Sequence, residues 1–340
     1  MSHSSPIRRL RALDANSAFK TCDPEFEAVL GGSPRLIEAV ATDAHEGVVY
    51  SSSEDALYFT SRSNPQDVPL PGTPAVDIKR LALDGDRFPV GPERISIIRS
   101  RANAANGMAL DRDGNLVVCE QGTRGAHARI SRLAPDSGDV HTIVDNWCGL
   151  RFNSPNDIVV KSDGTLWFTD PAYGYLQGFK AEPQIGDYVY RYDPGSGRLS
   201  VVADSFDKPN GLAFSPGEDV LYITDSGANQ EADSFYPGRP HHIVAFDVRD
   251  ERHLVNARLF AVTAPGFPDG IKVDEEGRVY TSSSTGVQVF NSIGDLIGEI
   301  HLPGAVNFAF GGPSRNILYI STDIAIWAAV LSAKGVRPCR

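Results

Sequence analysis

A short polar motif recurs along this chain, each time ahead of an apolar segment, a turn and a second apolar segment ending in Thr, Ser or Asp. The clearest copy starts at Pro155-Asn156-Asp157, and others start at Pro209-Asn210-Gly211 and Pro268-Asp269-Gly270. Weaker copies begin at Glu46, Asn106 and Asn307. Six copies of a small all-β unit, starting about 40–60 residues apart, are typical of a six-bladed β-propeller with four-stranded blades.

The repeat also predicts how the ring closes. A chain of 340 residues would ordinarily suggest two domains, but a repeat overrides that expectation. The last copy leaves room for only three strands, so we expect segment 26–41 to supply the fourth strand and remove free sheet edges. Residues 1–25 are then an N-terminal extension, and residues 26–340 form a single propeller domain.

The composition narrows the possible partners. The net charge of −11 and the pI of about 5.2 argue against a nucleic-acid partner and are compatible with a cation ligand. We find no apolar core of a signal peptide near the N-terminus and no apolar run of the roughly 18 residues that a membrane span needs. The four cysteines show no metal-binding spacing. We therefore expect a cytoplasmic protein with no membrane partner, whose oligomeric state the sequence does not indicate.

Propeller topology predicts where a functional site would lie. The residue that opens each copy and the loop after each second strand share one face of the ring. Those loops are long in the first four blades, and long loops gathered on one face usually carry function. They span residues 61–78, 121–129, 171–187 and 226–241. The opposite face should carry only short turns such as Asp113-Gly114 and Asp163-Gly164.

Four of the opening residues bear oxygen ligands: Glu46, Asn156, Asn210 and Asp269. Because side chains from several blades converge on a propeller axis, two carboxylates and two carboxamides would meet there. Two unpaired carboxylates so close together repel unless a cation or a proton lies between them. Oxygen ligands favour Ca²⁺, Mg²⁺ or Mn²⁺ over metals that prefer sulfur. The sequence therefore predicts one divalent ion, Ca²⁺ first, with Mg²⁺, Mn²⁺ or Zn²⁺ as alternatives.

The segments around these four residues resemble those of the gluconolactonase / senescence marker protein / luciferin-regenerating enzyme family. Segment 153–174 and Gly311-Gly312-Pro313 are similar to the gluconolactonase branch in particular. The resemblance implies a six-bladed propeller whose axial metal is held by those four side chains. It also implies hydrolysis of a small lactone, typically of a sugar acid. The chain departs from the family pattern at Val48, where a proline is common, and at Gln121, where we would expect histidine.

The expected mechanism is attack of an activated water on a metal-polarised carbonyl. Asp269 is our first choice for the general base, since it would act as ligand and base together. Asp170 and Asp225 end second strands on the same face, and each would assist catalysis or cap a turn. Candidate substrate-binding residues are Asn106, His127, Tyr173 and Asn307.

Three other functions are compatible with the same fold. The first is a phosphotriester hydrolase on the same scaffold, like diisopropyl fluorophosphatase and paraoxonase. The second is a non-catalytic propeller that binds calcium or a protein partner. The third is a strictosidine synthase-like enzyme that forms carbon–nitrogen bonds, but that branch dispenses with the metal, so the four ligand candidates argue against it.

Overall fold

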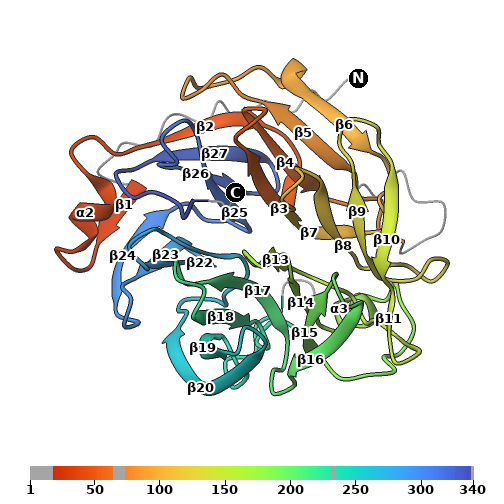
Figure 1. The fold of residues 1–340 in the computed structure, drawn as a ribbon. Helices are drawn as coiled ribbons and strands as arrows, with labels where there is room; N and C mark the ends of the chain where they lie inside the picture. Colours follow the sequence, from red (N-terminus) through yellow and green to blue (C-terminus); the bar gives the residue numbers. More distant parts are fainter. Residues whose placement is uncertain (1–17, 64–72, 232–233, 338–340) are drawn as a thin grey trace, which may run out of the picture.

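The computed structural model describes residues 18–63, 73–231 and 234–337, and it confirms the six-bladed β-propeller. Six antiparallel sheets surround one axis (Figure 1), and each contains four strands in chain order from the axis outward, except where the termini complete the ring. Blade 1 contains β3 (Ala44–Ser51), β4 (Ala56–Ser61), β5 (Ile78–Ala82) and β6 (Ile95–Arg99). Blade 2 contains β7 (Ala105–Leu110), β8 (Leu116–Glu120), β9 (Arg129–Leu133) and β10 (Val140–Val144).

The remaining blades repeat this order. Blade 3 contains β13 (Ile158–Val160), β14 (Leu166–Asp170), β15 (Tyr188–Asp193) and β16 (Arg198–Ala203). Blade 4 contains β17 (Pro209–Phe214), β18 (Val220–Asp225), β19 (His242–Arg249) and β20 (His253–Val262). Blade 5 contains β21 (Ile271–Val273), β22 (Val279–Ser283), β23 (Gly286–Phe290) and β24 (Leu296–His301). Blade 6 contains β25 (Phe308–Gly311), β26 (Ile317–Ser321) and β27 (Ala325–Val330), and a two-stranded ribbon, β11 (Asn146–Trp147) with β12 (Leu150–Arg151), links blades 2 and 3.

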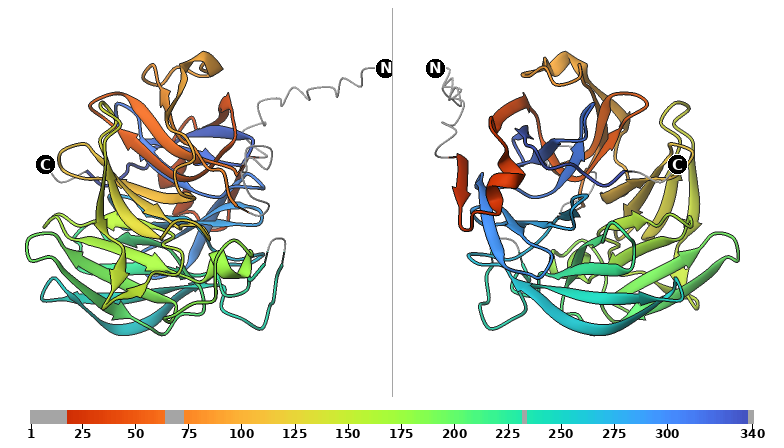
Figure 2. Two further views of the ribbon diagram at one scale, coloured as in Figure 1. Left: turned by 90° about the vertical axis from the view of Figure 1, so that its right-hand side faces the viewer. Right: turned by 60° about the vertical axis from the view of Figure 1, so that its left-hand side comes forward.

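The N-terminal segment closes the ring as predicted, but only part of it is a strand. Strand β2 (Arg35–Ala41) pairs antiparallel with β27 and is the fourth strand of blade 6. Residues at the start of the predicted segment instead form the short helix α2 (Phe26–Leu30), which buries Phe26 and Val29. Strand β1 (Phe19–Thr21) lies before the predicted domain boundary and pairs with β24 as a fifth strand of blade 5 (Figure 2).

The second strands of the blades are buried on both faces, which explains their apolar sequences. Every residue of β4, β8, β14, β22 and β26 is buried, because each strand lies between two neighbouring blades. The innermost strands contact one another in the order β3, β7, β13, β17, β21 and β25, and β25 returns to β3. This closed ring fixes the first residue of every blade at one end of the axis.

The predicted long loops coincide with the connections between second and third strands. They join β4 to β5, β8 to β9, β14 to β15 and β18 to β19, and the third contains the helix α3 (Tyr173–Leu176). The central nine residues of the first loop, 64–72, and residues 232–233 of the fourth lie outside the described part of the chain. The Asp-Gly turns at residues 113–114 and 163–164 connect first to second strands, at the opposite face. Within the described residues, no helix is long and apolar enough to cross a bilayer.

Candidate active site at the propeller axis

The residues that open the blades are placed by close backbone contacts between neighbouring blades. Asn106, Asn156 and Asp269 each turn their carbonyl oxygen toward a glycine of the preceding blade. A Cβ on Gly47 would lie 2.5 Å from Asn106 O, and one on Gly211 would lie 2.3 Å from Asp269 O. Gly107 N donates to Asn156 O at 2.7 Å in the same arrangement. Where a glycine follows the opening residue, at Gly47, Gly107, Gly211 and Gly270, the approach of the next blade therefore requires it.

In three blades, irregular pairing between the first and second strands changes the direction of the opening side chain. The register of β3 against β4 shifts on both sides of Glu46, and that of β7 against β8 shifts between Ala105 and Met108. The pairing of β17 with β18 shifts between Pro209 and Leu212, around Asn210. Such bulges release a residue from the strict alternation of a strand. Asn156 and Asp269 reach the same position by lying just before β13 and β21.

The prediction that Asn307 opens the sixth copy is wrong by one residue. Gly270 of blade 5 contacts Val306 O, so Val306 takes the position that the other opening residues hold. Asn307 instead occupies the position of the glycines, as Asp157 does in blade 3. Its Nδ2 donates to Glu46 Oε2 at 2.6 Å, while its Oδ1 accepts from Phe308 N at 2.7 Å. Asn307 thus holds Glu46 in place.

Glu46 and Asp269 form the acidic part of the axial site. Burial is the main cause that raises the pKa of the Glu46 carboxyl. Burial, followed by the negative charge of Glu46, raises the pKa of Asp269 well above its ordinary value. The neighbouring Asn210 side chain lowers that pKa but does not outweigh the other two effects. The two carboxylates therefore repel each other across a desolvated site, as the sequence predicts for Asp and Glu residues in phase.

The amide oxygens of the site have unused acceptor capacity. Asn156 and Asn106 each have a buried Oδ1 without a hydrogen-bond partner among the described residues. A buried carbonyl oxygen without a partner costs about 1–3 kcal/mol, and a hard cation removes that cost. No group of three or more His, Cys, Asp or Glu side chains in the described ranges is arranged to hold a metal. A metal at the axis would therefore depend on amide oxygens as well as on Glu46 and Asp269, and the donor set fits such an ion.

Tyr173 comes to the same site from helix α3. Ser226 and Asn210 lie close to its hydroxyl and lower the pKa of the phenol. Burial, and then the charge of Asp269, raise the pKa of Tyr173 well above its ordinary value, so the phenol remains protonated. The α3 loop is held over blade 3 by Ser154, whose Oγ accepts from Gly174 N at 2.9 Å. One predicted substrate-binding residue is therefore adjacent to the predicted metal ligands.

Two residues of the site were missed by sequence reasoning. His45 Nδ1 lies 2.6 Å from Asp323 Oδ1, and 41% of the His45 side chain is exposed. Burial lowers the pKa of His45, but the hydrogen bond to Asp323 and the charge of Glu46 outweigh it and raise the pKa overall. Asp157 adds a third buried carboxylate, whose Oδ2 has no partner among the described residues. Burial raises the pKa of Asp157 too.

Asp170 and Asp225 have the same structural task in blades 3 and 4. Asp170 accepts from Asn153 N at 2.9 Å and from Ser154 N at 2.7 Å. Asp225 accepts from the backbone N of residues 207, 208 and 227, at 2.9, 2.9 and 3.0 Å. Each aspartate thus anchors the loop that leads into the opening asparagine of its own blade. Burial raises the pKa of Asp170 to about 7. The catalytic role of both residues stays a prediction.

The remaining predicted residue lies away from this cluster. His127 is exposed on the loop between β8 and β9, and its backbone oxygen accepts from Asn103 Nδ2 at 2.9 Å. It lines two cavities, one between segments of blades 1 and 2 and one between the loops of blades 2 and 3, and neither is lined by an axial residue. Its role in substrate binding also stays a prediction.

Comparison with known proteins identifies the family. Residues 44–324 match the family model described as "SMP-30/Gluconolactonase/LRE-like region". This chain belongs to that family. The match spans all six blades, and with it the predicted family and the assignment of the protein as a lactone hydrolase are confirmed.

Individual relatives of this SMP-30/gluconolactonase family member support the same family assignment. It is 30% identical to lactonohydrolase oryL of Aspergillus oryzae over 316 residues, which cover 86% of this chain and 69% of that protein. It is 29% identical to gluconolactonase of Zymomonas mobilis over 285 residues, covering 82% and 75% of the two chains. A solved structure of a gluconolactonase, XC5397 from Xanthomonas campestris, superposes with a TM-score of 0.75 at 32% identity, covering 95% and 97%.

We expect Asp225→Asn to lower lactone hydrolysis by about 10–100-fold, the usual cost of losing a residue that orients a ligand. The new amide would place N–H groups against backbone N–H donors, which costs about 1–3 kcal/mol of unfolding free energy. Urea denaturation and steady-state kinetics measure the two effects. A loss above 1,000-fold at unchanged metal affinity would contradict the positioning role and favour a role in the chemistry.

We expect Gly211→Ala to disturb the site from the backbone side. Its Cβ would lie 2.3 Å from Asp269 O, so blades 4 and 5 must separate. Overpacking of this kind costs about 1–3 kcal/mol, and the shift displaces Asp269. Gly32→Ala is the matched control, because nothing lies within 4 Å of a Cβ at that position. Equal melting temperatures and equal turnover for the two variants would show that the inter-blade contact does not position Asp269.

Proposed function

We propose that this family member hydrolyses a small lactone with one divalent metal ion, Ca²⁺ first, held at the propeller axis by Glu46, Asn156, Asn210 and Asp269. The observation that carries the proposal is the meeting of two repelling, buried carboxylates with amide oxygens that lack partners. A bound divalent ion would supply positive charge to polarise the lactone carbonyl. The alternatives Mg²⁺, Mn²⁺ and Zn²⁺ use the same donors with different preferences in geometry.

Asp269 has the properties of the general base. In the metal-free protein, burial and the charge of Glu46 raise its pKa. Beside a bound ion, its carboxylate would be ionised and placed to take a proton from a nearby water. The resulting hydroxide adds to the lactone carbonyl carbon, and the ring C–O bond then breaks. The proton held by Asp269 passes to the departing alkoxide oxygen. The product is a hydroxy acid, and the carboxyl of Asp269 returns to its initial state.

Neighbouring residues would orient the reactants. Tyr173 remains protonated and lies beside Asn210, so it limits the positions that Asn210 and a substrate can take. Asn307 fixes one oxygen of Glu46 through its amide. Asn106 opens blade 2 with a free acceptor oxygen, which suits a hydroxyl group of the substrate.

The substrate class is proposed from the relatives and from the polar character of the site. Gluconolactonase and lactonohydrolase are the names of relatives that span more than four fifths of this chain. The axial cluster offers amide, carboxyl and phenol groups, which match a ring with several hydroxyls better than an aliphatic ring. We therefore place sugar-acid lactones first.

A substrate panel tests the proposal. Purified protein is assayed by pH-stat with glucono-δ-lactone, an aliphatic δ-lactone and a phosphotriester, each with and without a chelator. Turnover of the lactones that the chelator abolishes and added metal restores supports the proposal. Preferential turnover of the phosphotriester would contradict the proposal and indicate a phosphotriester hydrolase. Turnover of none of the three substrates would favour a non-catalytic binding propeller.

A further inference from the structure

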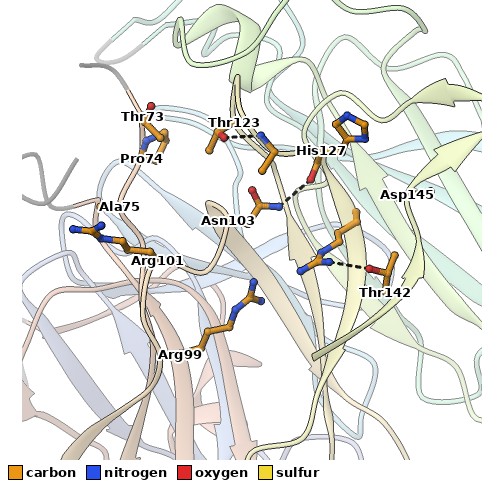
Figure 3. A pocket seen from close by; sticks show the side chains of 12 residues that line it. Thr73, Pro74, Ala75, Arg99, Arg101, Asn103, Thr123, His127, Thr142 and Asp145 are labelled. Carbon is orange, nitrogen blue, oxygen red and sulfur yellow. Dashed lines mark hydrogen bonds between the residues drawn. The ribbon is translucent and has the colours of Figure 1, made fainter. Parts of the chain in front are cut away.

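One of the two cavities lined by His127 lies on the loop-bearing face between blades 1 and 2, outside the axial cluster. Its volume is about 450 Å³, which is enough for a small organic molecule rather than an ion alone. Three arginines line it: Arg99 at the end of β6, Arg101 just after it, and Arg129 at the start of β9. Figure 3 shows Arg99 pointing toward Asn103, whereas Arg101, near Ala75, extends away from Arg99.

A buried carboxylate fixes two of these arginines. Glu120 is completely buried and accepts from Arg99 Nη1 at 2.6 Å and from Arg129 Nε and Nη2 at 2.8 and 3.2 Å. Burial raises the pKa of Glu120, but hydrogen bonds from Arg99, Arg129 and Ser131 outweigh it and lower the pKa overall. Glu120 is therefore ionised and holds both guanidinium groups in one orientation.

Two guanidinium groups of this cavity share one buried carboxylate. One carboxylate faces two guanidinium groups whose side chains are only 19% and 28% exposed. Arg101 adds a third positive charge, Asp145 adds a negative charge among the lining residues, and Asp77, whose Oδ1 accepts from Arg101 N at 2.9 Å, adds another. Positive charge that is partly removed from water is unfavourable without a counter-ion. Glu120 alone therefore offsets only one of the two charges of Arg99 and Arg129.

Hydrogen-bond donors complete the arrangement. Arg129 Nη1 donates to Thr142 Oγ1 at 2.8 Å, so the hydroxyl proton of Thr142 is left to point elsewhere. Thr123 Oγ1 accepts from Gly125 N and Ala126 N at 3.2 and 3.1 Å, which leaves its proton free in the same way. Guanidinium groups bind carboxylate and phosphate oxygens in pairs, and hydroxyls add donors at the edge.

We infer that this cavity is a binding site for a small organic anion that carries a phosphate or carboxylate group. The oxyanion is held by Arg99 and Arg129, with Arg101 at the entrance, and the rest of the ligand fills the cavity toward Thr73 and Thr123. None of the four predicted metal ligands lines this cavity. The site is therefore separate from the proposed lactonase centre and does not depend on it.

The test measures binding to the metal-loaded protein by isothermal titration at constant ionic strength. The probes are inorganic phosphate, glucose 6-phosphate and gluconate, with chloride as the non-specific anion. We expect saturable binding of at least one of the first three, and none with chloride. Stronger binding of glucose 6-phosphate than of gluconate identifies a phosphate ligand, and the reverse order identifies a hydroxy-acid ligand.

Two variants locate the binding. Arg101→Gln, at the exposed rim, and Arg99→Gln should each weaken the tightest probe at least tenfold without changing lactone turnover. The matched control is Arg198→Gln, since Arg198 lines a cavity of equal volume, about 450 Å³, with Arg191 and Arg252 between blades 3 and 4. If Arg99→Gln does not fold, Arg101→Gln decides alone. Absence of saturable binding, unchanged affinity in Arg101→Gln, or an equal loss in Arg198→Gln would overturn the proposal.

Discussion

Replacing Asp269 by asparagine is expected to remove nearly all lactone hydrolysis, by about 1,000-fold or more, while the protein stays folded. The substitution keeps the shape of the side chain but removes the proton acceptor, which alone contributes about 10²–10⁴-fold in general base catalysis. It also removes one of the two carboxylate charges available to a divalent ion. The loss should persist at saturating metal, because the added ion cannot replace the base. Steady-state kinetics across metal concentrations measures it.

The same variant has a distinct signature in stability. The pKa of Asp269 is raised by burial and by the charge of Glu46, so ionised Asp269 destabilises the metal-free protein. Asp269→Asn removes this repulsion, and we expect the metal-free variant to melt at the temperature of the metal-free wild type or above. Asp113→Asn, at an exposed turn on the opposite face, is the control. Wild-type turnover of Asp269→Asn at saturating metal would refute both the base assignment and the axial mechanism.

The fold was predictable because it depends on local patterns that repeat. Five blades open on a polar residue, four of these residues are followed by a close-packed glycine, and the second strands are buried on both faces. All three features can be recognised in the sequence. Glu46, Asn156, Asn210 and Asp269 hold the same position in four copies of that repeat, so their convergence at the axis could be predicted. Closure by the N-terminal segment was predictable as well, because the last copy lacks a strand.

The interactions that finish the site were not predictable from the repeat. The contact of His45 with Asp323 joins residues 278 positions apart, and no periodic signal links them. Asn307 lies one position later than the other polar residues, and only the contact of Gly270 with Val306 reveals this shift. Asp157 replaces the glycine of its blade, and the sequence alone does not show that its carboxylate turns toward a desolvated interior. These features depend on side-chain packing between blades rather than on patterns within them.

Removing the metal is expected to abolish turnover and to make the stability of the protein depend on pH in a defined direction. The pKa values of Glu46 and Asp269 are raised in the folded, metal-free protein, first by burial. Above the ordinary carboxyl pKa of about 4, the folded state then holds more protons than the unfolded chain. The unfolding free energy of the chelated protein should therefore be highest at the acidic end and fall as pH rises through the folded pKa values.

A bound divalent ion takes the place of the protons on Glu46 and Asp269. Saturating metal should therefore oppose the fall of the unfolding free energy with rising pH. At a metal concentration 1,000 times the dissociation constant, binding adds about 4 kcal/mol to the unfolding free energy. Metal binding near pH 6 should also release protons, because the carboxylates must be ionised to bind. Calorimetric titration in buffers of different ionisation enthalpy measures that release, and thermal melts from pH 5 to 8 measure the stability. Proton release that is the same in wild type and in Asp269→Asn would mean that the ion binds elsewhere than at the carboxylates of the axis.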